Sequence, residues 1–325
     1  MKKFLAKIAL FALLSCALVG VLFFVSYFAM PEAFSDSYQR GFNYQYYALK
    51  NAGTEPKIMV LGGSHMTFAT DTRLLSKLSG RPAYTLGVHS GTGMCYVFET
   101  AKQFVNKGDI VVFCFMPMRE NDYGTDLIFL SFEKDFGLFW EFAKAHPALT
   151  ALKVGSALYT KWYNLVYKAL KRRFLKSDNK PLSVYHSIAF DERTGNMIYP
   201  RPGKDPTVPD SELDGAKYSF TTALVSFGSG ASVLNKFNEF CLERGAKFYI
   251  ALPPIYENSV ENNDKELSGY EASLARSFDA PVISSIKETE VPKDCLYDFI
   301  LHMNDKGVER YTTVLYNDLL RSGAF

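Results

Sequence analysis

Three residues in two distant stretches of the chain could together carry out nucleophilic catalysis. Ser64 follows an apolar run and two glycines, whereas Asp298 and His302 lie four residues apart near the C-terminus. A serine hydroxyl is a poor nucleophile near neutral pH unless a base takes its proton and an acceptor orients that base. The three residue types therefore suit attack on an ester carbonyl. The alternative is that Ser64 sits in an ordinary glycine turn and that the other two are solvated loop residues.

The stretch around Ser64 has the pattern of a buried strand that passes through a sharp turn into a helix. Ile58–Leu61 is apolar and partly β-branched, as expected for a buried strand. The glycines that follow let the backbone turn sharply, and Asp71 is a suitable N-cap for a helix over residues 71–78. In an open α/β sheet such a turn lies in the crevice where ligands bind.

Strands and helices alternate on both sides of a central interruption, which predicts an α/β fold. Alternation at this spacing implies right-handed crossovers and a parallel sheet, so we expect a flavodoxin-like three-layer α/β/α sandwich over residues 57–325. Residues from about 119 to 225 carry several aromatic helices and interrupt the pattern as a helical insertion. This insertion is either a lid over the site or a structural excursion. Strands are predicted at residues 57–61, 83–88, 109–115, 247–252 and 281–284, and the last helix at 305–320 after Asn304 as its cap.

The N-terminal segment has the length and composition of a membrane span. Ile8–Met30 contains no charged residue and is 23 residues long, which at about 1.5 Å per residue crosses a hydrocarbon core of about 30 Å. Three lysines precede it, so the positive-inside rule places the N-terminus in the cytoplasm. We expect residues 1–30 to be a cytoplasmic tip and transmembrane signal anchor, and residues 31–56 a juxtamembrane stalk. A cleaved signal peptide is the alternative.

Composition and motifs argue against several classes of function. The 36 basic residues are offset by 34 acidic ones, so there is no nucleic-acid signal. The five cysteines have no CxxC or Cys/His ligand spacing, which makes a zinc site unlikely; a disulfide among some of them is possible, but the sequence does not select it. The chain lacks G-x-G-x-x-G after its first strand and lacks a P-loop. We therefore expect no metal and no cofactor.

Five stretches follow one another along the chain with distinctive motifs: residues 57–65, 82–91, 107–113, 245–254 and 297–307. In this order they resemble the motif blocks of the SGNH/GDSL-type hydrolases, specifically of a membrane-anchored branch whose members begin with one transmembrane helix; the first stretch resembles the nucleophile block. The resemblance covers about residues 40–120 and 230–320. Related extracytoplasmic proteins act in D-alanylation of teichoic acids and O-acetylation of exopolysaccharides.

The resemblance implies roles for individual residues. Ser64 would be the nucleophile, His302 the base and Asp298 its orienting acceptor. The backbone N–H groups of Ser64 and Gly87 would donate to the oxyanion. Further residues are assigned to the surroundings of the site: His65 in a structural or supporting role beside the nucleophile, His89 lining the pocket, and Asn121 as the nearest counterpart of the oxyanion asparagine that the family has after its third strand.

This chain also departs from the family pattern. Thr85 stands where the family usually has asparagine, and the Asp–His spacing is one residue longer than the common one. We expect an extracytoplasmic serine esterase or O-acyltransferase, anchored in the cell membrane by one helix, that acts on a cell-envelope glycan or acylated polymer. A membrane-embedded acyl-donor protein is a candidate partner. The alternative is a catalytically silent relative that binds glycan or a partner protein.

Overall fold

The computed structural model describes residues 1–124, 127–174, 183–221 and 230–325. Two compact units divide the chain between them. The helical unit comprises Met1–Arg40 and Asp126–Ser187, and the α/β unit comprises Gly41–Thr125 and Ile188–Phe325. Each unit is described by itself below.

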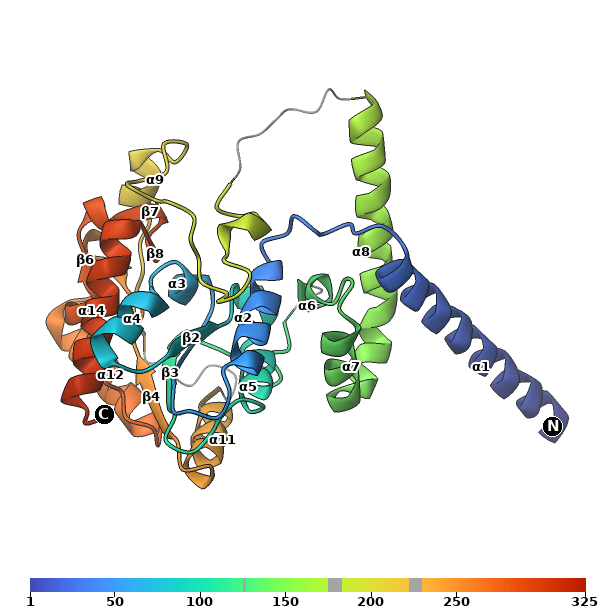
Figure 1. Ribbon diagram of the computed structural model, residues 1–325, viewed down its shortest axis with the longest axis horizontal. Helices are drawn as coiled ribbons and strands as arrows, with labels where there is room; N and C mark the ends of the chain where they lie inside the picture. Colours follow the sequence, from blue (N-terminus) through green and yellow to red (C-terminus); the bar gives the residue numbers. More distant parts are fainter. Residues whose placement is uncertain (125–126, 175–182, 222–229) are drawn as a thin grey trace. The chain divides into compact units, whose positions relative to one another are not determined.

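A four-stranded parallel sheet forms the centre of the α/β unit (Figure 1). Its strand order is β2-β1-β3-β4, and each neighbouring pair is parallel. This confirms the parallel sheet expected from the sequence. The predicted strand at 281–284 is reduced to one isolated bridge, in which Val282 pairs with Ile250. The strands of the sheet are β1 (Ile58–Leu61), β2 (Ala83–Leu86), β3 (Ile110–Cys114) and β4 (Lys247–Ala251).

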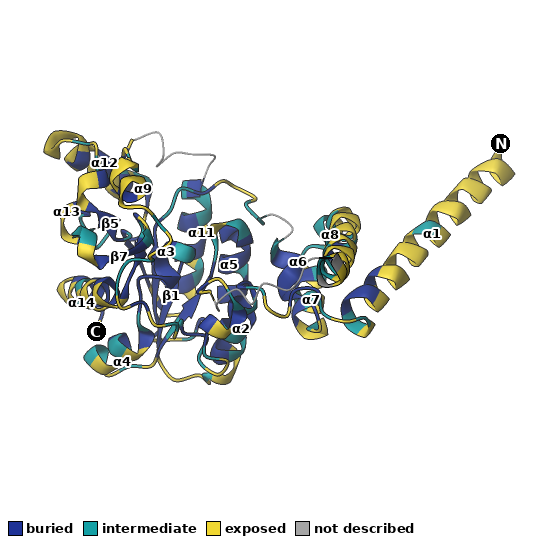
Figure 2. Cartoon of the chain, turned by 90° about the horizontal axis from the view of Figure 1, so that it is seen from above, coloured by how far each residue is buried: buried dark blue, intermediate teal, exposed yellow. Residues whose placement is uncertain are grey.

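Helices cover both faces of this sheet. In Figures 1 and 2, α4 and α14 lie on one face, and α2, α5 and α11 lie on the other. Helix α4 begins after Asp71, whose side chain accepts hydrogen bonds from the backbone N–H groups of Arg73 and Leu74. Helix α14 begins after Asn304, which caps it through the N–H of Gly307, and both caps were predicted. The bounds are α2 (Arg40–Asn51), α4 (Thr72–Ser79), α5 (Met94–Ala101), α11 (Gly230–Glu243) and α14 (Asp305–Arg321).

Shorter elements complete the unit. They are α3 (Ser64–Thr67), η2 (Ser90–Thr92), η3 (Ser187–Ala189), α9 (Asp210–Gly215), β5 (Ile255–Tyr256), η4 (Glu257–Ser259), α12 (Asp264–Ser277), α13 (Ile286–Thr289), β6 (Glu290–Val291), η5 (Lys293–Cys295), β7 (Leu296–Phe299) and β8 (His302–Met303).

The buried strands supply apolar side chains to both faces, because successive side chains of a strand point in opposite directions. On one face, Val60 and Val112 belong to the same buried cluster as Tyr311 and Leu315 of α14. On the other face, Phe113 packs edge-on against Phe98 of α5, with ring centroids 5.0 Å apart. The apolar runs that were predicted as buried strands therefore contribute side chains to the hydrophobic core on both faces of the sheet.

A buried ion pair joins the starts of β1 and β3. Lys57 Nζ lies 2.7 Å from Asp109 Oδ2, and the two side chains are 1% and 0% exposed. Asp109 also accepts the backbone N–H groups of Lys57, at 3.0 Å, and of Asn106, at 2.8 Å. Each charge is thus satisfied by a partner rather than left buried alone.

The helical unit contains the membrane-span candidate. Helix α1 (Lys2–Phe24) continues into the π-helical turn η1 (Val25–Ala29), and together they are long and apolar enough to cross a membrane. Figure 2 shows α1 exposed along most of its length. The other helices of this unit are α6 (Leu127–Ser131), α7 (Phe136–Ala145) and α8 (Pro147–Phe174).

Specific contacts fix the end of this apolar helix to α8. Tyr27 donates a hydrogen bond to the carbonyl of Ala157 at 2.9 Å, and the indole N–H of Trp162 donates to Ser26 at 3.2 Å. Buried Glu133 pairs with buried Lys161 and accepts the backbone N–H groups of residues 33 and 34. The segment that follows α1 is therefore packed against the helices of its unit.

Two predicted boundaries differ from the structure. The stalk predicted over residues 31–56 includes α2, from which Phe42, Tyr46 and Leu49 are buried; residues from Gly41 onward belong to the α/β unit. The predicted insertion at about 119–225 is shorter, because the chain re-enters the α/β unit at Ile188. The polar, proline-bearing stretch after Ile188 has the composition of an exposed loop. Composition alone therefore did not predict that this stretch belongs to the α/β unit. Residues 125–126, 175–182 and 222–225 of the predicted insertion lie outside the described residues.

Candidate active site

Ser64 lies at the turn that follows the central strand β1. Gly63 is the N-cap of α3, and Ser64 is the first helical residue. The loop after β2 approaches this turn closely at Gly87. A Cβ at Gly87 would lie 1.9 Å from the carbonyl oxygen of Gly62, and the φ of Gly87 is 120°. Only glycine fits at that position, and its presence brings two strand ends together beside Ser64.

The structure brings the three predicted catalytic side chains together. His302 Nε2 lies 3.1 Å from Ser64 Oγ, and His302 Nδ1 lies 2.9 Å from Asp298 Oδ1. Asp298 lies in β7 and His302 begins β8, and these two strands form an antiparallel pair. Ser64 and His302 are 238 positions apart in the sequence. A serine, an imidazole and a carboxylate therefore form one continuous hydrogen-bonded chain.

This order of groups defines how protons are arranged. The carboxylate accepts the Nδ1–H of His302, so His302 Nε2 carries no hydrogen and can accept the Ser64 hydroxyl proton. His302 is 8% exposed, which restricts competing hydrogen bonds from water. The arrangement can therefore generate a nucleophilic alkoxide equivalent at Ser64.

Sequence reasoning missed two residues that position His302. Phe68, directly after α3, stacks on the imidazole. The guanidinium of Arg201 lies 5.2 Å from the Phe68 ring centroid, and its Nη1 donates to the Phe68 carbonyl at 3.2 Å. Asp305 holds the backbone of Arg201 through two hydrogen bonds of 3.0 and 2.8 Å. The only available signal was that Phe68 follows Ser64 by one helical turn; nothing in the sequence pointed to Arg201.

Two further histidines lie near the catalytic chain, and burial lowers the pKa of both. His65 Nε2 lies 3.0 Å from the carbonyl oxygen of Cys114, so it must carry the hydrogen. Burial, with a smaller contribution from His302, lowers the pKa of His65 to about 4. His89 Nδ1 accepts the N–H of Gly91 at 2.9 Å, and burial again lowers its pKa.

Two of the three predicted oxyanion donors, Gly87 and Asn121, are not placed to bind an oxyanion beside Ser64. The N–H of Gly87 donates to the side-chain oxygen of buried Gln45 at 2.8 Å, so in this structure it is already bonded. Asn121 lines a surface pocket together with Glu99 and Lys102, and that pocket contains no member of the catalytic chain. The N–H of Ser64 lies in the first turn of α3, where helix geometry supplies no acceptor. It is therefore the predicted donor that remains suitable.

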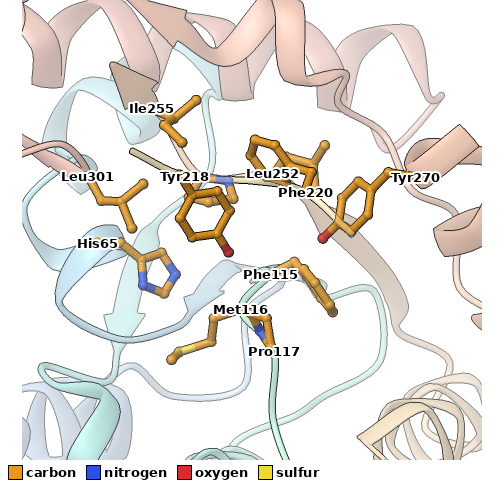
Figure 3. Close-up of a pocket in the computed structure, with 11 residues that line it drawn as sticks. His65, Phe115, Met116, Pro117, Tyr218, Phe220, Leu252, Ile255, Tyr270 and Leu301 are labelled. Atoms are coloured by element: carbon orange, nitrogen blue, oxygen red, sulfur yellow. The ribbon is translucent and has the colours of Figure 1, made fainter. Parts of the chain in front are cut away.

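Figure 3 shows a pocket that is lined mostly by apolar side chains of the α/β unit. Its cavity volume is about 40 Å³. Two of its lining residues, His65 and Leu301, are the sequence neighbours of Ser64 and His302. The complete lining is His65, Phe115, Met116, Pro117, Tyr218, Phe220, Leu252, Pro253, Ile255, Tyr270 and Leu301.

Comparison with known proteins finds no matching protein-family model and no matching curated protein. Within the part of the chain that the structure describes, no group of three or more histidine, cysteine or acidic side chains could hold a metal ion. All five cysteines are free thiols. The geometry of Ser64, His302 and Asp298 therefore carries the functional proposal.

Proposed function

We propose that this protein is a serine esterase or O-acyltransferase with the SGNH/GDSL-type hydrolase fold. The observation that carries the proposal is the hydrogen-bonded chain from Ser64 through His302 to Asp298. Its position after the central strand of a parallel sheet supports it, because such sheets bind ligands at the carboxyl ends of their strands.

The reaction follows from the positions of these groups. Ser64 Oγ attacks the carbonyl carbon of an ester while its proton passes to His302 Nε2. Asp298 stabilises the imidazolium, and the N–H of Ser64 donates to the oxyanion of the tetrahedral intermediate. When the intermediate collapses, His302 returns the proton to the departing alcohol. Water or a sugar hydroxyl then attacks the acyl-enzyme, giving the free acid or a new ester and restoring Ser64.

The proposed setting is the outer side of a cell membrane. The apolar stretch of α1 from Ile8 onward and the three lysines before that stretch support an N-terminus in the cytoplasm and an α/β unit outside. Phe24, at the end of α1, packs against Phe136, which stacks on Trp140. Aromatic residues are enriched at membrane interfaces. The resemblance noted in the sequence then favours a cell-envelope glycan or acylated polymer as acceptor and keeps a membrane-embedded acyl-donor protein as a candidate partner.

A second candidate function is glycan or partner binding without catalysis. The hydrogen bond between Gly87 N–H and Gln45 favours it, because it occupies an expected oxyanion donor. The position of Asn121 in a separate pocket favours it as well. Loss of one oxyanion donor costs about 10²–10³ in rate in an enzyme where it has been measured.

Labelling with a fluorophosphonate probe tests the enzymatic proposal. The full-length chain should be labelled, and Ser64→Ala should not. Ser268→Ala, which removes an exposed hydroxyl on α12, is the matched control and should be labelled like the original chain. Labelling that persists in folded Ser64→Ala would reject Ser64 as the nucleophile. An unlabelled original chain that binds polysaccharide would favour the second function.

A further inference from the structure

The exposed side of α8 carries aromatic and aliphatic side chains. Tyr159, Tyr163, Val166 and Leu170 follow one another at intervals of three or four residues, so they lie along one side of the helix. Their exposed fractions are 72%, 58%, 53% and 51%. The rings of Tyr159 and Tyr163 stack, with centroids 6.2 Å apart. We call these four residues the outer stripe of α8.

The side of α8 that packs against its own unit is the one that forms ion pairs. Lys161 is fully buried there and pairs with buried Glu133, and Lys168 Nζ lies 3.0 Å from Asp36 Oδ1. A surface helix of a water-soluble protein buries its apolar side and exposes its charged side. The arrangement in α8 is the reverse. This reversal indicates that the outer stripe contacts an apolar partner rather than water alone.

The end of the apolar helix is bonded to the middle of α8. Ser26 and Tyr27 belong to η1, which completes the apolar segment Lys2–Ala29. Their partners on α8, Trp162 and Ala157, lie within two residues of the outer stripe in the sequence. Figure 1 shows α1 leaving its unit beside α8. Because an α-helix is only about 10–12 Å across, the middle of the outer stripe lies within about one helix diameter of the point where the apolar segment ends.

Charge favours a lipid surface over a second copy of this chain as the partner. The sequence of α8 contains six lysines and arginines and no acidic residue. Anionic lipid headgroups attract such a helix, whereas two copies of α8 packed together would repel each other. Tyrosine also suits the boundary of a membrane, because its ring is apolar and its hydroxyl can remain in the hydrated headgroup layer.

We infer that the outer stripe of α8 is embedded in the headgroup region of the membrane that α1 crosses, in contact with anionic lipid. The inference rests on the part of the proposed function that places α1 across a membrane, and it does not depend on catalysis by Ser64. The stripe is a second membrane contact in addition to α1. Two contacts fix the orientation of the helical unit on the bilayer surface, which one helix alone does not.

Spin labels on the full-length chain in nanodiscs of phosphatidylcholine and phosphatidylglycerol test this inference. Cys16 is exposed on α1 and the other four cysteines are buried, so the original chain takes up one label within the apolar segment. In a Cys16→Ser background, Tyr163→Cys places the label on the outer stripe. Leu242→Cys is the matched control, because Leu242 is a 60% exposed residue of α11 in the α/β unit.

Power-saturation EPR compares relaxation of each label by molecular oxygen, which concentrates in lipid, with relaxation by a nickel chelate, which stays in water. The label at Tyr163→Cys should respond more to oxygen and should lie about 5–10 Å into the boundary between headgroups and acyl chains. Tyr159→Cys, one helical turn earlier, should give the same result, so a local disturbance at one position does not decide the outcome. The label at Leu242→Cys should respond more to nickel.

The possible outcomes separate this inference from the proposed function. Stronger relaxation by nickel at both stripe positions, with the Cys16 label relaxed by oxygen, would overturn the α8 contact and leave the anchor intact. Nickel access at Cys16 would reject the anchor and the inference with it. Protection of the stripe from both reagents would show that protein covers it, and dipolar broadening would identify that protein as a second copy; either result overturns the lipid assignment. Fluorophosphonate labelling of Ser64 tests catalysis independently of these results.

Discussion

The ring of Phe68 lies flat on the imidazole of His302, with centroids 4.1 Å apart and planes only 10° from parallel. Phe68 is fully buried, and its backbone carbonyl accepts a hydrogen bond from Arg201. Asp298 fixes one nitrogen of the imidazole, while this stack fixes the plane of the ring. Together the two contacts direct Nε2 toward Ser64.

Replacing Phe68 should therefore affect the reaction more than substrate binding. We expect Phe68→Leu to lower kcat about tenfold with little change in KM, because a displaced base is costly even when the substrate still binds. Steady-state kinetics at saturating ester measures this split. Phe299→Leu is the matched control: its half-exposed ring meets the same imidazole by an edge, at 5.5 Å. A rise in KM at constant kcat for Phe68→Leu would contradict a positioning role.

Asp298 should be required for the base to work. In Asp298→Asn, the amide can donate to Nδ1 and favour the tautomer with hydrogen on Nε2, which cannot accept the serine proton. The same change in a serine protease lowers kcat about 10⁴-fold, and we expect a loss of that order here. Ester hydrolysis by Asp298→Asn and by Asp294→Asn, an exposed aspartate four positions earlier, should be compared. Equal activities would remove Asp298 from the mechanism.

Stability should fall on mild acidification because of His65. Its pKa is about 4 in the folded chain and 6.5 in the unfolded chain. Between these values the unfolded state binds a proton that the folded state does not, so the free energy of unfolding decreases as pH falls from about 6.5 to about 4. The full effect is on the order of 3 kcal/mol, and it is absent above about pH 6.5.

The variant His65→Gln isolates this contribution. Glutamine can still donate to the Cys114 carbonyl, but it does not titrate. Urea unfolding at pH 7.5 and at pH 5 should show a smaller loss of stability for His65→Gln than for the original chain. His89, whose pKa is also lowered, remains in both proteins and so cancels in the comparison. Identical losses would show that His65 is protonated without unfolding.

The buried pair Lys57–Asp109 should behave asymmetrically under single and double substitution. Lys57→Met alone leaves a buried carboxylate without its cation and should cost about 3–5 kcal/mol. The double variant Lys57→Met/Asp109→Leu removes both charges and should cost less than Lys57→Met alone. It still loses the bonds from the backbone N–H groups to Asp109, so it should not be neutral. Urea unfolding of the two variants measures the difference; a costlier double variant would contradict this account.

Membrane insertion should depend on the middle of α1. Each arginine at the centre of a transmembrane helix costs about 2.5–3.5 kcal/mol on an insertion scale. The original chain should give a carbonate-resistant membrane fraction, and the variant Leu13→Arg/Leu14→Arg should lose much of it. Leu152→Arg, at an exposed leucine of α8, should retain that fraction. Equal retention by both variants would indicate that α1 does not span the bilayer.

Local patterns in the sequence were sufficient to predict the strands and helix caps that depend on interactions between neighbouring residues. The apolar runs of β1 and β3 and the caps Asp71 and Asn304 are each specified by a few neighbouring residues. The sequence also indicated the types of the candidate catalytic residues, because each of these side chains can do chemistry that few others can. The parallel sheet followed from the alternation of strands and helices.

Only the tertiary structure decided the contacts between residues far apart in the chain. The Phe68–His302 stack, its support by Arg201 and the bond from Gly87 to Gln45 join segments that share no periodicity, so no local pattern could predict them. The unit boundaries at Gly41 and Ile188 were missed for the same reason, since composition does not distinguish a packed segment from an exposed one. The sequence determined which groups could react, and packing determined where each of them lies.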